Sequence, residues 1–382
     1  MVNAVYDHII AILVVGSIFV GAVVMLPGMS LMNIQAVDQQ QLRNTALNVF
    51  NAMLLDVGEP LDWGSIDPFY MNDQRVGRFG LASAQDSAFY VLDPDKVQRI
   101  VVENPLNYIE YDRVRELLRL QGYGFRFRII PPFNVTNLDG SPITNKSPIT
   151  IMGRELSYAV KVKYLYGAPI PNALVKATII YTDGLNLAII TRILVQTDAV
   201  GICRDATPLR FEPKHVIAVL RVTVADVATL VVTFSNLTTS SNNIANINFV
   251  GDTIVLTTPD PTPLDARWVD SIIPIYSDER VEFLYNGTRS NNDKLNYGSF
   301  RVWQKNFSGL RHHHPTVFVF SFWAVIKGKG RQEVLVAGPY QNLMGYTIFE
   351  YGGSPKSESV ALQRSVIISG MTYTAELMLW KE

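Results

Sequence analysis

Cysteine is almost absent from this chain of 382 residues, which contains only Cys203. A single thiol cannot form an intrachain disulfide or supply a thiolate cluster for zinc. Charged residues are also scarce, at 18% of the chain, and 33 Lys and Arg nearly balance 34 Asp and Glu. Nucleic-acid-binding proteins normally carry a basic excess, so we expect no nucleic-acid partner.

Catalytic signatures are missing as well. The sequence contains no GxSxG, HExxH or GxxxxGK[ST] motif. His312, His313 and His314 are adjacent, so a regular element would not direct all three at one metal, and we interpret them as an exposed loop. Asp93 and Asp95 lack the spaced acidic loop of a calcium site. We therefore expect no enzyme, no cofactor and no metal site.

Charge is missing altogether from the segment Ile9–Leu26, IIAILVVGSIFVGAVVML. Extended back to Val5, this segment gives roughly 33 Å of helix, enough for a ~30 Å hydrocarbon core. A cleaved secretory signal is the alternative, but such a signal has a basic region, and no Lys or Arg precedes Ile9. The segment predicts an uncleaved transmembrane helix with membrane lipid as its partner.

The next segment, about 31–55, has the pattern of an amphipathic helix. Apolar residues recur at Leu42, Ala46, Val49 and Met53, while glutamines and asparagines occupy much of the remaining surface. Two alternatives remain open: the stripe packs against partner helices, or it docks on the protein's own globular part.

A long N-terminal helix, apolar first and amphipathic second, before a β-rich head resembles type IV pilins and pseudopilins, including archaeal ones. Asp7 stands where that family has an acid, and Pro27 where it has a helix kink. The resemblance implies a structural subunit of a cell-surface filament, a homo-oligomer through its N-terminal helix. The helix-packing candidates are Asp7, Ile10, Val14, Phe19, Leu42, Val49, Phe50 and Met53.

The segment 56–135 predicts a small α+β collar. Asp93 and Pro94 are suited to the cap and first position of a short helix, and Tyr108–Gln121 to a second helix. In Tyr123–Ile130, Phe125, Phe127 and Ile129 alternate with Arg126 and Arg128, as in a half-buried strand.

The remainder predicts a mainly β fold with two β-sandwich domains, at 136–240 and 241–382, after the helix at 1–55. Tyr158, Val160, Val162, Tyr164 and Tyr166 would share one face of a strand. The sequence GAPIPNALVKATIIYTD…VQTDAVG resembles Ig-like modules of bacterial and archaeal surface proteins. This resemblance implies an Ig-like sandwich over Leu156–Asn236. Dense aromatics after 281 indicate a second core, or alternatively a carbohydrate-binding platform.

Four sequons favour an extracellular position for these domains, with glycosylation candidates Asn134, Asn236, Asn286 and Asn306. We therefore expect the protein in the cell membrane or in a cell-surface filament. The alternative function is a singly anchored adhesin or ligand-binding protein that does not polymerise, with a cell-surface glycan or protein as its partner.

Overall fold

The computed structural model describes most of the chain. Its residues are 2–66, 69–84, 90–101, 108–141, 143, 148–192, 195–234, 246–259, 268–283, 285–286, 294–297, 300–309, 317–326, 329–338, 349–356 and 358–382. Within the N-terminal helix, side chains are described for 10–21 and 38–55. Strands predominate in these residues, so the prediction of a mainly β protein is confirmed.

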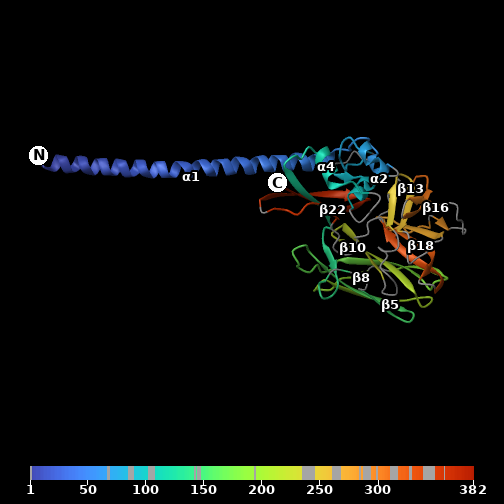
Figure 1. Cartoon of the computed structure of the whole chain (residues 1–382). Helices are drawn as coiled ribbons and strands as arrows, with labels where there is room; N and C mark the ends of the chain where they lie inside the picture. Colours follow the sequence, from blue (N-terminus) through green and yellow to red (C-terminus); the bar gives the residue numbers. More distant parts are fainter. Residues whose placement is uncertain are drawn as a thin grey trace.

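One helix, α1 (Val2–Leu55), forms the N-terminal part and projects from a β-rich head (Figure 1). At 1.5 Å per residue it is about 81 Å long. The helix continues through Pro27 without a break. Among the side chains of α1 that the structure describes, those that pack on the head lie in its last turns and include the buried Leu42, Ala46, Val49, Phe50, Met53 and Leu54.

The predicted pair of a transmembrane helix and an amphipathic stalk requires correction. No helix in the described part of the chain is both long enough and apolar enough to cross a membrane. Nor is α1 amphipathic over its length, because 10–21 is exposed on all sides and a buried face exists only between Leu42 and Leu54.

The collar is built on a five-stranded sheet in the order β1-β21-β22-β2-β20. Its strands are β1 (Val91–Leu92), β2 (Tyr123–Ile130), β20 (Phe349–Gly352), β21 (Ser359–Ile368) and β22 (Met371–Lys381). α1 lies against β21 and β22. The C-terminal strands, predicted for the second sandwich, therefore belong to the same sheet as the collar strand β2.

Short helices complete the collar, namely η1 (Trp63–Ser65), α2 (Phe69–Asn72), η2 (Asp73–Arg75), α3 (Pro94–Val97), η3 (Gln98–Ile100) and α4 (Tyr111–Leu117). The predicted cap of α3 is confirmed, since Asp93 accepts a hydrogen bond from the Asp95 amide at 2.9 Å. α4 is shorter than the predicted Tyr108–Gln121 helix. In β2, Phe125, Phe127 and Ile129 are buried, as predicted.

The first sandwich consists of two facing sheets, β3-β5-β4 with β9 on β5, and β11-β10-β6-β7 with β8 on β6. Val160 of β5, Ala177 of β6 and Leu220 of β10 share the core between them. The strands are β3 (Asn134–Thr136), β4 (Ile149–Met152), β5 (Glu155–Lys163), β6 (Leu174–Thr182), β7 (Leu187–Thr191), β8 (Val195–Gln196), β9 (Ile202–Pro208), β10 (His215–Val224) and β11 (Val227–Phe234).

The head contains two further four-stranded sheets, β12-β13-β17-β16 and β15-β14-β18-β19. Trp303 of β17 packs edge-on against Phe320 of β18, with ring centroids 6.2 Å apart, and joins the two sheets. Their strands are β12 (Asn246–Val250), β13 (Thr253–Pro259), β14 (Trp268–Ile275), β15 (Tyr285–Asn286), β16 (Lys294–Tyr297), β17 (Phe300–Asn306), β18 (Val317–Ile326) and β19 (Lys329–Gly338).

A shared core connects the parts of the head. The face of β10 opposite the first sandwich carries Ile217 and Val219, which belong to one cluster with Phe50 of α1, Leu377 of β22 and Val319 of β18. Because β10 is buried on both faces, its sequence HVIAVLRVTV is an almost continuous apolar run.

Candidate functional site

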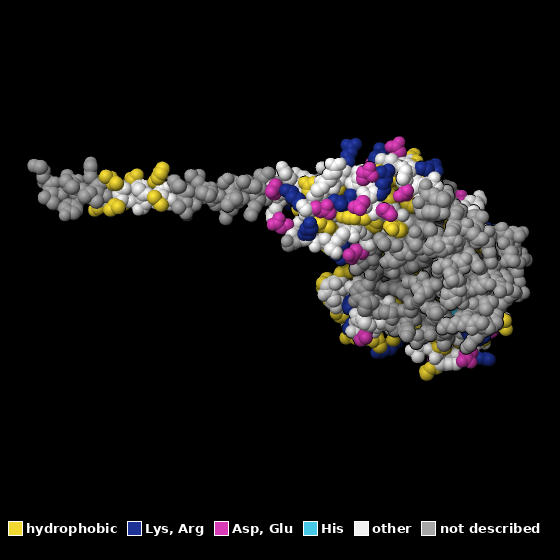
Figure 2. Space-filling model, viewed as in Figure 1, with side chains coloured by type: hydrophobic (Ala, Val, Ile, Leu, Met, Phe, Trp, Pro, Cys, Tyr) yellow, Lys and Arg dark blue, Asp and Glu magenta, His cyan; other side chains and the backbone are white. Residues whose placement is uncertain are grey.

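The most unusual surface is the apolar segment of α1 at 10–21, which is yellow in Figure 2 where it is described. None of its described side chains is buried. Large apolar side chains in this segment are between 52% and 71% exposed: Ile10, Ile12, Leu13, Val14, Val15, Ile18, Phe19 and Val20. Successive helix positions differ by about 100°, so these residues surround the whole helix.

The only hydroxyl in this segment offers little to a polar ligand. The Ser17 hydroxyl donates to the Leu13 carbonyl at 2.7 Å, within the same helix. A Cβ added at Gly16 or Gly21 would meet no atom within 4 Å, so both glycines face open space. The described part of the segment is therefore an uninterrupted apolar cylinder.

The structure resolves the two alternatives for the second half of α1. Leu42, Val49, Phe50 and Met53 are each at most 6% exposed and belong to the core of the head. These four helix-packing candidates thus pack within their own chain and are not available to a partner in this fold. Ile10, Val14 and Phe19 remain exposed, while the side chain of Asp7 lies outside the described residues.

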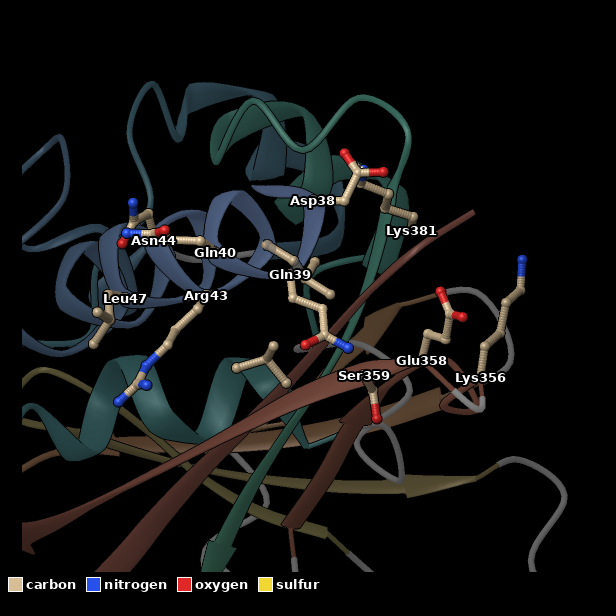
Figure 3. A pocket seen from close by; sticks show the side chains of 12 residues that line it. Asp38, Gln39, Gln40, Arg43, Asn44, Leu47, Lys356, Glu358, Ser359 and Lys381 are labelled. Atoms are coloured by element: carbon tan, nitrogen blue, oxygen red, sulfur yellow. Dashed lines mark ion pairs between the residues drawn. The ribbon is translucent and has the colours of Figure 1, made fainter. Parts of the chain in front are cut away.

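A groove of about 1110 Å³ opens where α1 reaches the head. Figure 3 shows Gln39 and Arg43 projecting from α1, with Lys356 and Glu358 on the opposite wall. Lys381 of β22 pairs with Asp38 of α1, Nζ to Oδ1 at 3.1 Å, and ties the end of the sheet to the helix. This ion pair adds a polar contact to the buried face by which α1 packs on the head.

A buried polar cluster holds the collar together, and the sequence gave no signal for it. Lys96 is fully buried, and its Nζ donates to the carbonyls of Val57 and Ala82, both at 2.9 Å. Arg99 donates to the carbonyls of Gly64 and Ile66 and stacks over the Phe69 ring at 4.6 Å. Buried charges are tolerated only when paired and hydrogen-bonded in this way. These side chains serve the fold.

Asp95 links the collar to the sheet that contains β12 and β13. Its Oδ2 accepts from the Ser65 hydroxyl at 2.9 Å and from the Gly251 amide at 3.1 Å. Gly251 lies in the turn between β12 and β13. The carboxylate considered for calcium thus joins the Ser65 side chain to the backbone at Gly251.

The described residues offer little reactive chemistry. They contain no group of three or more His, Cys, Asp or Glu side chains that could hold a metal. Cys203 is buried in β9, and burial raises the pKa of its thiol to about 11, so it is a poor nucleophile. Arg128 pairs with Glu376, and Arg126 with Glu350 at 3.6 Å, so neither forms a basic strip. His312–His314 lie outside the described residues.

The glycosylation candidates occupy different environments. Asn134 is 9% exposed within β3, where a glycan has little room. Asn306 is exposed at the end of β17, and its Nδ2 donates to the Thr253 hydroxyl at 3.2 Å. Asn236 lies outside the described residues, as does the side chain of Asn286.

An exposed aromatic turn follows β5. The strand ends at Lys163, so Tyr164 and Tyr166 lie in a turn, whereas Tyr158, Val160 and Val162 are buried as predicted. The predicted face therefore stops short of both tyrosines. Gly167 and Pro169, which are typical of turns, indicate in the sequence that the strand ends near this point.

Comparisons with known proteins show no family for this chain. No family model matches it, and no curated protein matches it. One similar solved structure is trypsin-activated alpha-2-macroglobulin from Escherichia coli, at 9% identity and a TM-score of 0.20, covering 59% of this chain and 19% of that one. This chain thus spans about a fifth of that protein's length.

Two further solved structures are similar over longer shares of their own length. Invasin, a bacterial integrin-binding protein, has 13% identity and a TM-score of 0.15, over 64% of this chain and 54% of that one. A chimeric titin Z1Z2 tandem has 11% identity and a TM-score of 0.16, over 51% and 98%. TM-scores this low do not establish a shared fold. The sandwich is defined by the two facing sheets of this chain.

Proposed function

We propose that this protein is a structural, pilin-like subunit of a cell-surface filament, in which the apolar segment of α1 packs against the same segment of other copies. The observation that carries this proposal is the exposure of eight large apolar side chains between Ile10 and Val20. A helix that is apolar on all sides is normally buried.

Many copies suit this surface better than one. A single partner helix covers one side of α1, whereas the exposed side chains surround it, so full burial requires a bundle. Full burial of an exposed large apolar side chain stabilises by about 1.5–3 kcal/mol, so the eight side chains, which their own helix already covers in part, together contribute on the order of 10 kcal/mol. This is comparable with the association cost, about 4–15 kcal/mol.

The arrangement of the head supports the same role. α1 is fixed to the head through its buried face and the Asp38–Lys381 ion pair, while 10–21 projects away from it (Figure 1). In a bundle of such helices the heads occupy the outside. The role is structural, and no described residue is assigned to catalysis.

The experiment compares the full-length protein with Val14→Lys. Val14 is 52% exposed on the projecting helix, so the substitution leaves the head intact but places a charge inside the bundle. The matched control is Asn44→Lys, which adds the same charge to an exposed polar position of the same helix. Samples prepared in a mild detergent are examined by sedimentation and electron microscopy after its removal.

We expect rods or large oligomers for the unmodified chain and for Asn44→Lys, and monomers for Val14→Lys. Monomers from the unmodified chain at every concentration would overturn the proposal, as would oligomers of unchanged size from Val14→Lys. A monomer would favour the second candidate, a cell-surface adhesin that acts as single copies. The exposed turn with Tyr164 and Tyr166 supports that candidate.

A further inference from the structure

The turn after β5 presents a pair of stacked tyrosine rings to solvent. The rings of Tyr164 and Tyr166 are nearly parallel, at 4°, with centroids 5.2 Å apart. Tyr164 is 39% exposed and Tyr166 is 79% exposed, and Leu165 between them is 47% exposed. One face of each ring is used in the stack, so Tyr166 keeps an open face.

This turn is held in shape by its own backbone. The Tyr164 amide donates to the Ala168 carbonyl at 2.8 Å, and the Gly167 amide donates to the Tyr164 carbonyl at 2.9 Å. Gly167 has a φ of +96°, which a residue with a Cβ adopts only with strain. The open ring face is thus fixed in advance, which lowers the entropy cost of binding a ligand.

A second turn, Asp198–Gly201, lies beside the first. The Val162 amide donates to the Gly201 carbonyl at 2.7 Å, and a Cβ added at Gly201 would lie 3.1 Å from Pro169. Val200 in this turn is 52% exposed. Together the two turns form an exposed end of the first sandwich, which we call the tyrosine tip: Tyr164, Leu165, Tyr166, Asp198 and Val200.

Polar groups of fixed position accompany the apolar ones. The Oδ1 atom of Asp198 accepts from the amides of Val200 at 3.0 Å and Ile202 at 2.8 Å. Its Oδ2 atom has no partner among the described residues, and neither phenol hydroxyl of the stacked pair has one. The tip therefore combines an open aromatic face, two hydroxyls and an oriented carboxylate oxygen.

We propose that the tyrosine tip binds a neutral carbohydrate, with a sugar ring lying on the open face of Tyr166. A sugar presents C–H groups on the face of its ring and hydroxyls at its edge, which match the aromatic face of Tyr166 and the oxygen atoms of the two neighbouring turns. The proposal goes beyond filament assembly and does not depend on it, because the tip and the apolar segment of α1 share no residue.

Other partners fit the tip less well. The four apolar side chains of the tip, those of Tyr164, Leu165, Tyr166 and Val200, offer roughly a few hundred Å², well below the ~800 Å² that each partner contributes to a stable protein interface. Insertion into a lipid surface would bury the Asp198 carboxylate without a cation, which is costly. The tip therefore suits a small ligand better than a protein or a lipid surface.

The test uses an array of immobilised neutral oligosaccharides of hexoses and N-acetylhexosamines, probed with the full-length chain, followed by calorimetric titration of the strongest ligand. We compare Tyr166→Ala and Tyr166→Phe with Leu185→Ala. Leu185 is 72% exposed in another turn of the same sandwich, and its substitution serves as the matched control.

We expect Tyr166→Ala to bind about tenfold more weakly, which corresponds to about 1.4 kcal/mol, because the substitution removes the ring on which the sugar lies. Tyr166→Phe keeps the ring and should stay within about threefold of the unmodified chain, and Leu185→Ala should be unchanged. An array with no bound oligosaccharide would overturn the proposal, and so would equal affinity of Tyr166→Ala and the unmodified chain. Neither result bears on filament assembly, which is read by sedimentation.

Discussion

At the scale of single residues, the collar depends on a close approach of backbone at Gly80. A Cβ added there would lie 2.1 Å from the Asp56 carbonyl oxygen and 2.9 Å from the Gly58 amide. The Gly80 carbonyl also accepts a hydrogen bond from the Trp63 indole at 2.9 Å. The segment that leaves α1 can therefore pack on 78–82 only if residue 80 has no side chain.

We predict that Gly80→Ala destabilises the head, by about 2–3 kcal/mol or more, because neither neighbouring backbone can withdraw easily. Gly77→Ala is the matched control, since its Cβ would meet its nearest atom at 3.9 Å. Urea unfolding of both variants, followed by the fluorescence of tryptophans that include the buried Trp63, measures the difference. Equal midpoints would contradict the close approach.

At the scale of elements, α1 behaves as two different surfaces on one helix. Between 10 and 21 it exposes apolar side chains on every side, and between Leu42 and Leu54 it buries one face against β21 and β22. Both parts have the same helical geometry. They differ in exposure because the head covers one face of the second part, whereas no described element covers the first.

The buried face predicts a large effect for Phe50→Ala. Phe50 is 1% exposed, and truncation of a buried phenylalanine costs about 3–5 kcal/mol. The adjacent exposed residue provides the control, Asn51→Ala, which should leave stability almost unchanged. Thermal or urea unfolding measures the stability of both variants. A Phe50→Ala protein as stable as Asn51→Ala would show that this face is not part of the core.

At the scale of the whole molecule, the head and the projecting part of α1 contribute different properties. All described contacts of α1 with the head lie from Asp38 onward, while residues 10–21 touch no other element. Folding of the head therefore should not require the N-terminal part of the helix.

We predict that a chain lacking 2–37 folds to the same head and remains monomeric. Its melting temperature should match that of the unmodified protein, because the buried face of α1 and the Asp38–Lys381 pair are retained. Calorimetry and sedimentation check both statements. An unfolded product would show that the helix is needed for the head, and an oligomer would place the assembly surface elsewhere.

The local sequence pattern was sufficient to predict part of this fold. The helical conformation of α1, the cap of α3 at Asp93 and the alternation of Phe125, Phe127 and Ile129 in β2 depend on neighbouring residues, so the sequence predicts them. The absence of charge between Ile9 and Leu26 likewise marks the segment on which the proposed assembly rests.

Only the tertiary structure decided which surfaces meet. β2 and β22 pair along their length although Tyr123 and Lys381 are far apart in the chain, and no periodicity specifies such a partner. The same holds for the burial of Lys96, whose carbonyl partners come from other segments, and for the stripe of α1, which the head covers. Sequence sets the conformation that each segment prefers, whereas burial depends on contacts between segments that only folding brings together.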